Sequence, residues 1–172
     1  LKSLKKLNLT NIFFINEVAI KKIINSNSLV ENYKVFKKYP SELNIEINKT
    51  KFLANINKNG KLYLIGSNGK YLDNNYSVEN IPYIFGNPKI SQFLSFKNII
   101  DQSPILYSEV KNLYFFQSNR WDIKFRNNIL IKLPETSVSK ALKDVSDFLF
   151  EYNLKNIKII DMRVKNQIIV NE

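Results

Sequence analysis

The spacing of apolar residues near the start of the chain predicts a short helix. Ile20, Ile23 and Ile24 follow the i, i+3, i+4 spacing of one helical face. Asn16 can serve as the N-cap, because its side chain can accept a hydrogen bond from the first turn. The polar run at 25–28 is expected to end this helix.

The period of the pattern then changes from that of a helix to two, which is typical of a β-strand. Tyr33 and Val35 alternate with lysines within 30–38, and apolar residues alternate with Glu and Asn over 43–47. Pro40 separates the two segments and favours a turn. These patterns predict a hairpin packed with the helix, which together form a small α/β unit.

From Phe52 the pattern is one of strands joined by tight turns. Residues 53–56 and 62–65 flank Asn59-Gly60, a dipeptide typical of type I′ hairpins because both central positions need a positive φ. A second turn is expected at 67–69, because it combines Ser, Asn and Gly.

The remaining chain predicts two further helices among strands. The expected elements are a helix at 89–102, a meander of strands at 110–116, 120–126 and 129–133, a helix at 137–152, and strands at 156–164 and 166–170. The last helix carries a continuous apolar stripe and can be capped by Thr136 or Ser137, so it is expected to pack on a sheet. The expected fold is α+β: the α/β unit followed by a mostly antiparallel β domain with packed helices.

Composition excludes several classes of chemistry. The 172 residues include no Cys and no His, which rules out thiol catalysis, Ser-His-Asp triads and His-ligated metal sites. We therefore expect no catalytic residue, no cofactor and no metal. No run of about 18 apolar residues is present, so no part of this chain is expected to cross a bilayer.

The positive charge of the chain is spread over its length. Lys+Arg is 26 and Asp+Glu is 15, which gives a formal net charge of +11. Arg, whose planar fork suits bidentate contacts with phosphate, occurs only at positions 120, 126 and 163. A solvated basic surface is therefore favoured over a nucleic-acid site.

Several short motifs resemble those of a known family. Residues 120–125 and 129–134 are similar to a hairpin pattern R-W-x-L-x-L … I-x-L-P, and residues 160–163 are similar to a strand pattern V-D-L-R. Earlier, residues 35–47 combine a basic strand, a Tyr-Pro step and a Leu-x-Ile strand, and residues 68–72 are similar to a D-x-x-G segment. With these motifs in this order, the chain resembles the periplasmic region of the FtsQ/DivIB family of bacterial cell division proteins.

The resemblance implies a domain organisation and a function. Residues 1–49 would form a partial POTRA domain that lacks its first strand, and residues 50–172 the β domain. The protein would be a non-enzymatic scaffold that links other division proteins, FtsB and FtsL above all. A membrane helix upstream of this chain would anchor it in the inner membrane, with this region in the periplasm. Asn68 and Val164 depart from the family pattern, which has Asp and an aromatic residue there.

The terminal strand is the clearest candidate for binding a partner. Residues 167–170 are largely apolar and β-branched, and they lack the charges and prolines that usually block an exposed strand edge. Such an edge can accept an added strand, although the segment could instead be paired on both sides within its own sheet. The resemblance implies that FtsB binds in this terminal region. The candidate partner-binding residues are Arg163, Val164, Gln167, Ile168, Ile169, Val170 and Arg120.

Some of the side chains near this region have two interpretations. Asp161 and Arg163 lie two positions apart, so they form either a structural ion pair or a pair that faces a partner. Arg120 is expected to point into solvent, where it belongs to a solvated face or contacts acidic groups. Trp121 is expected in the core against the helix at 137–152, with an exposed binding anchor as the alternative.

Two other functions stay open on the sequence alone. A POTRA-containing assembly or secretion factor of the outer membrane would also bind by strand addition, but it would carry several POTRA units and a barrel. A basic nucleic-acid-binding domain would lose affinity steeply with salt and would not need the last strand.

Overall fold

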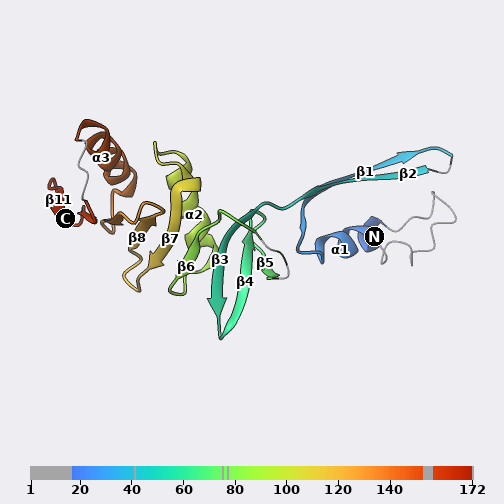
Figure 1. Cartoon of the computed structure of the whole chain (residues 1–172). Helices are drawn as coiled ribbons and strands as arrows, with labels where there is room; N and C mark the ends of the chain where they lie inside the picture. The colour runs from blue at the N-terminus through green and yellow to red at the C-terminus, as the bar shows by residue number, and fades with distance from the viewer. Residues whose placement is uncertain (1–16, 41, 75, 77, 153–156, 172) are drawn as a thin grey trace.

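The computed structural model describes residues 17–171 apart from 41, 75, 77 and 153–156. Its first part consists of α1 (Glu17–Asn25) and a two-stranded antiparallel sheet of β1 (Val30–Lys38) and β2 (Glu42–Lys49). The predicted helix and both predicted strands are confirmed, whereas the predicted cap Asn16 lies outside the described residues. Figure 1 shows this hairpin extending away from the rest of the molecule, with α1 beside it.

A small apolar cluster holds this first part together. Ile20 and Ile24 from α1 and Val30 from β1 are buried, and Tyr33 and Val35 pack against them. The apolar face of the predicted helix and the apolar face of the predicted strand therefore pack against each other. Phe36, on the opposite face of β1, is 47% exposed, as alternation requires.

The remaining strands form one mixed sheet. Their order is β11-β10-β9-β8-β7-β6-β3-β4-β5 among the described residues. The strands are β3 (Phe52–Lys58), β4 (Lys61–Gly66), β5 (Tyr71–Asp73), β6 (Tyr83–Phe85), β7 (Val110–Phe115), β8 (Trp121–Phe125), β9 (Leu130–Lys132), β10 (Ile159–Asp161) and β11 (Ile169–Asn171). The pairs β3–β6, β6–β7 and β9–β10 are parallel and the other neighbouring pairs are antiparallel. The prediction of a mostly antiparallel sheet is confirmed.

Turn chemistry explains the hairpins. Asn59 and Gly60 have φ values of 53° and 81°, so the β3–β4 connection is the type I′ turn that the Asn-Gly dipeptide predicts. Strands β7, β8 and β9 follow one another in an antiparallel meander, also as predicted. Asn128, with a φ of 70°, turns the chain between β8 and β9.

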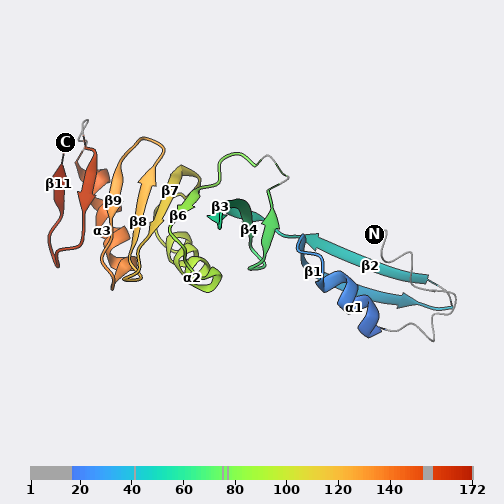
Figure 2. The same ribbon diagram turned by 90° about the horizontal axis from the view of Figure 1, so that it is seen from below.

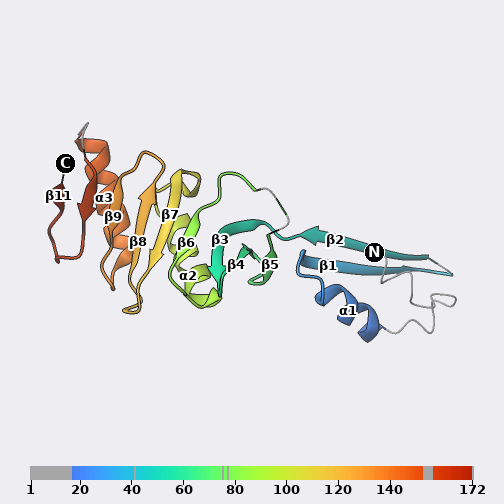
Figure 3. The same ribbon diagram turned by 60° about the horizontal axis from the view of Figure 1, so that its bottom comes forward.

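Two helices cover one face of the large sheet. They are α2 (Ile90–Asp101) and α3 (Val138–Glu151), and Figure 3 shows both behind the strands. A short 3₁₀ turn, η3 (Tyr107–Glu109), precedes β7. The buried side chains beneath the helices form one apolar cluster, which includes Phe93, Phe96, Leu113, Ile123, Ile131, Leu142 and Val145. The apolar stripe of the last helix therefore packs on the sheet, as predicted.

Local geometry corrects three details of the sequence interpretation. Ser137 stands at the N-cap of α3, but its backbone is left-handed and its side chain makes no capping hydrogen bond. The last two strands, β10 and β11, are much shorter than predicted. Asn166 has a φ of 60° and the Gln167 N–H donates to the Val164 carbonyl, so residues 164–167 form a turn instead of strand.

The two sheets are separate in the described residues. Strand β2 ends at Lys49, β3 begins at Phe52, and the two apolar clusters have no member in common. Figure 2 shows the two-stranded sheet at one end of the molecule and β11 at the other. The division of the chain into residues 1–49, as a partial POTRA domain, and residues 50–172, as a β domain, stays a prediction.

Candidate partner-binding edge

Strand β11 is the outermost strand at one end of the nine-stranded sheet. It pairs antiparallel with β10 through Ile159–Asn171, Ile160–Val170 and Asp161–Ile169. In the strand order β11 has a neighbour on one side only, so its other side is an open edge. The alternative that the strand is paired on both sides is therefore wrong for the described residues.

Apolar side chains are exposed on β11 and in the segment that leads into it. Ile169 is 47% exposed, Val164 is 45% exposed and Ile168 is 36% exposed. Val170 is half-buried and packs against the main core, which anchors the strand. Gln167 is exposed, and its N–H closes the turn that precedes the strand. Exposed apolar side chains on an unpaired strand are the combination that favours pairing with another chain.

Arg163 is fixed beside the edge by Asp161. The Arg163 Nε donates to both carboxylate oxygens of Asp161 at 2.8 and 3.0 Å, and the Arg163 main-chain N–H donates to the same carboxylate at 3.1 Å. These side-chain hydrogen bonds hold the pKa of the Asp161 carboxyl below its usual value, against the opposite effect of partial burial. Asp161 and Arg163 therefore form an ion pair with each other, which is one of the two interpretations of the sequence, and 43% of the Arg163 side chain stays exposed.

Arg120 lies in a different environment from the one predicted. Its side chain is only 21% exposed, because the guanidinium lies over the Phe116 ring, 4.0 Å from the ring centroid. Its Nε lies 3.3 Å from the Asp122 Oδ1 in an ion pair, and this buried atom has no hydrogen-bond partner among the described residues. The expectation of a solvent-facing Arg120 is wrong, since the aromatic ring and the carboxylate draw it onto the sheet. Arg126, by contrast, is exposed, and its Nε donates to the Ser108 carbonyl.

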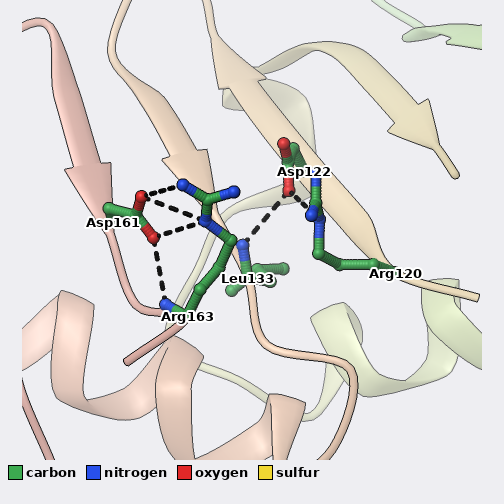
Figure 4. A network of polar contacts seen from close by, with 5 residues as sticks. All are labelled: Arg120, Asp122, Leu133, Asp161 and Arg163. Carbon is green, nitrogen blue, oxygen red and sulfur yellow. Dashed lines mark hydrogen bonds and ion pairs between the residues drawn. The ribbon is translucent and has the colours of Figure 1, made fainter. Parts of the chain in front are cut away.

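Asp122 is the polar residue that the sequence pattern did not reveal. It is only 4% exposed, although it alternates along β8 with the core residues Trp121 and Ile123. Burial raises the pKa of the Asp122 carboxyl, while the positive charge of Arg120 and the N–H of Leu133 oppose this rise. Figure 4 shows the Asp122 carboxylate between Arg120 and the Leu133 N–H, with Arg163 and Asp161 on the neighbouring strand side.

The register of the strands places the charged residues Asp161, Lys132 and Asp122 in one row across the sheet, and this row ends at Ile169 on the open edge. Ile169 pairs with Asp161, Asp161 pairs with Lys132, and Lys132 pairs with Asp122. Paired residues of adjacent strands share a face, so this row lies on the face opposite to the helices. The row therefore leads from the open edge at Ile169 to Asp122 and its partner Arg120. These residues are far apart in the sequence, so the sequence alone does not indicate that they lie in one row.

Trp121 belongs to the core. It is 5% exposed, and its ring stacks on Phe96 of α2 with a centroid distance of 4.6 Å and an interplanar angle of 6°. Phe115 lies against the same ring at 4.8 Å. The prediction of a core tryptophan is confirmed, although its stacking partner is on α2 and not on the last helix. Trp121 is therefore not an exposed anchor for a partner.

The described residues offer an edge and a fixed charge, and no group that could hold a metal. No cluster of three or more Asp, Glu, His or Cys side chains occurs among them. Within the same residues, no helix is long and apolar enough to cross a membrane. What this end of the sheet can do chemically is to pair main-chain groups with an added strand and to contact acidic groups through Arg163.

Comparison with known proteins identifies similar sequences. A model of the C-terminal region of the cell division proteins FtsQ/DivIB matches residues 54–163. The chain is 26% identical over 168 residues to Cell division protein FtsQ of Bradyrhizobium diazoefficiens, a match that covers 94% of this chain and 48% of that protein. It is 26% identical over 164 residues to Cell division protein FtsQ of Rickettsia bellii, covering 92% of this chain and 60% of that protein.

A more distant bacterial relative is also similar. Cell division protein DivIB of Clostridium tetani is 25% identical over 168 residues, covering 88% of this chain and 63% of that protein. The chain thus spans between about half and under two thirds of these relatives. The major extracytoplasmic domain of DivIB from Geobacillus stearothermophilus superimposes with a TM-score of 0.42 at 9% identity, over 63% of this chain and 99% of that chain.

Proposed function

Because this chain belongs to the FtsQ/DivIB family of cell division proteins, we propose that it is a non-enzymatic scaffold of the division machinery. In this proposal it binds FtsB, and through it FtsL, by accepting a strand of the partner at the edge of β11. The whole protein would be held in the inner membrane by a segment outside this chain, with the described domains in the periplasm. The proposed binding residues are Arg163, Val164, Gln167, Ile168, Ile169 and Val170, with Arg120 in support.

The open edge of β11 is the observation that carries this proposal. A strand added there would extend the sheet by one member and satisfy main-chain groups that now face water. The exposed side chains of Val164, Ile168 and Ile169 would lose contact with water when the partner covers them. Main-chain pairing supplies affinity in such complexes, and the pockets between alternate side chains supply selectivity.

The positive charge of Arg163 beside the edge would favour a partner strand that carries an acidic group. Arg163 is held in one conformation by Asp161, so binding of an acidic partner group would cost little side-chain entropy. Arg120 contributes differently from the sequence expectation, because it is mostly covered. It keeps the buried carboxylate of Asp122 paired and so maintains the strand that carries the charge row.

The proposal is tested by placing a charge on the edge. Ile169→Lys places an ammonium group at a position where the native side chain is 47% exposed, so the fold should persist. A lysine on an exposed edge blocks strand addition, and we expect affinity for a purified FtsB segment to fall by at least tenfold. The measurement is isothermal titration calorimetry, with circular dichroism to check the fold.

The matched control carries the same kind of change away from the edge. Leu106, which precedes η3, is 67% exposed, and Leu106→Lys should leave affinity unchanged. Equal affinity for wild type and Ile169→Lys would place the interface elsewhere. Equal weakening by both variants would show that added positive charge alone, and not the edge, explains the effect.

A further inference from the structure

The turn at Gly66–Lys70 lies where the two sheets meet, and its hydrogen bonds reach into both. This turn joins β4 to β5 in the nine-stranded sheet, and Gly66 and Lys70 close it, since the Gly66 N–H donates to the Lys70 carbonyl at 3.0 Å. Figure 3 shows the chain passing from β2 to β3 at the same place. We call the contact between residues 25–31, 50–51 and 66–70 the joint.

Asn68 makes the central contacts of the joint. Its side-chain Nδ2 donates to the Ser28 carbonyl at 2.8 Å and to the Val30 carbonyl at 2.9 Å. Its Oδ1 accepts the Lys70 N–H at 3.1 Å, which shapes its own turn. The amide group therefore uses its acceptor within the large sheet and both of its donors on the first part of the chain.

Further hydrogen bonds surround these contacts. The Lys70 ammonium donates to the carbonyl of Asn25, the last residue of α1, at 2.8 Å. The Ser67 hydroxyl donates to the Glu31 carboxylate at 2.6 Å and accepts the Lys51 N–H at 2.9 Å. The Thr50 N–H donates to the Leu29 carbonyl at 2.9 Å. The bonds of Lys70 with Asn25 and of Ser67 with Glu31 link the first part to the turn. The bonds of Thr50 with Leu29 and of Lys51 with Ser67 hold the connection between β2 and β3 against both.

The centre of the joint is closely packed. Thr50 is only 7% exposed, and its hydroxyl accepts the Asn68 N–H at 3.3 Å. A Cβ at Gly66 would lie 2.7 Å from both the Asn68 Oδ1 and the Thr50 Oγ1, so a side chain there would displace the polar groups of the joint. Apolar burial does not link the two parts in the described residues, because their core clusters are separate. Their relative orientation therefore rests on this polar contact.

We propose that the joint is a rigid coupling, with Asn68 as its positioning residue, that makes the two sheets tumble as one body in solution. Contacts between domains of one chain are usually polar and allow relative motion. Here several directed hydrogen bonds converge around a buried threonine, and they restrict both bending and rotation. The edge of β11 is then presented at a fixed direction relative to the β1–β2 hairpin. This inference goes beyond the proposed docking of a partner and does not depend on it.

Pulsed electron paramagnetic resonance between two spin labels tests the coupling. The chain has no cysteine, so Asn44→Cys in β2 and Asn98→Cys in α2 place labels at exposed positions without side reactions. We expect one narrow distance distribution for this labelled protein. Adding Asn68→Ala should broaden the distribution at least twofold, while circular dichroism shows that the secondary structure is kept.

Two further variants separate the bridging contacts from the shape of the turn. Asn68→Asp keeps an acceptor for the Lys70 N–H but removes the donors to Ser28 and Val30, so it should broaden the distribution like Asn68→Ala. Asn127→Ala removes a similar side-chain acceptor from the β8–β9 turn, far from the joint, and should leave the distribution narrow.

The outcomes decide the inference. A narrow distribution in Asn68→Asp, or equal broadening in Asn127→Ala, would overturn it. If Asn68→Ala does not fold, Lys70→Met removes only the ammonium contact with Asn25, and broadening in that variant supports the coupling while an unchanged width overturns it. A broad distribution in the labelled protein before any change at the joint would also overturn it.

Discussion

Leu142 is expected to be the most sensitive position on α3, because it is fully buried beneath the helix. Its exposed fraction is 0%, and it belongs to the same cluster as Ile123 and Ile131. Leu142→Ala removes three carbon atoms, which at about 0.8 kcal/mol each accounts for roughly 2.4 kcal/mol of lost transfer free energy. The cavity left behind adds to this loss, so the free energy of unfolding should fall by roughly 3–4 kcal/mol, within the range of about 2–5 for such changes.

The assay is urea unfolding followed by the fluorescence of Trp121, the only tryptophan of the chain, whose ring stacks on Phe96. Phe150→Ala is the matched control on the same helix, since Phe150 is 95% exposed and its loss should change stability by less than about 0.5 kcal/mol. In a thermal melt the Leu142 variant should unfold roughly 6–15 °C lower. Equal stability of the two variants would show that α3 does not pack on the sheet through this stripe.

Three other outcomes are expected from the structure. The pKa of the Asp161 carboxyl is lowered in the folded state, so its pairing with Arg163 stabilises the protein above the unfolded pKa of about 3.9. This stabilisation is lost as the pH falls through the folded pKa. Asp161→Asn should therefore be less stable than wild type at pH 7 in urea titrations, and the difference in stability should disappear in acid. Gly86→Ala should cost more stability than Gly60→Ala, because both glycines have positive φ but only at Gly86 would a Cβ meet a backbone oxygen, that of Phe115, at 2.3 Å; equal unfolding midpoints would contradict this. Arg163→Glu should weaken FtsB binding at low salt and less so at high salt, because screening reduces the charge effect; a loss that is independent of salt would point to a structural cause.

Local sequence patterns predicted most of the fold. Alternation in 30–38 and the Asn59-Gly60 dipeptide each correspond to one backbone conformation, so the first strand and the β3–β4 hairpin could be placed within a residue or two. The short terminal strands were overestimated, because their ends are set by turns. The turn at 164–167 depends on the positive φ of Asn166, and that conformation is not specified by alternation.

The candidate site was only partly visible in the sequence. The apolar character of residues 168–170 is local, so the strand and its lack of blocking charges could be recognised directly. The position of the strand at the end of the sheet and the burial of Asp122 are properties of strand order, which residues far apart in the chain determine. Alternation within 120–126 predicted a solvent-facing Arg120. It could not show that the ring of Phe116, at the end of the preceding strand, covers the guanidinium.

Amide hydrogen exchange measures the proposed strand addition most directly. Backbone N–H groups of residues 168–171 would be compared in the free protein and in the presence of saturating FtsB segment. Pairing of a partner strand with β11 predicts at least tenfold slower exchange at alternate residues of this stretch, with little change in β5 at the opposite edge of the sheet. Binding of the segment without protection of residues 168–171 would contradict the account.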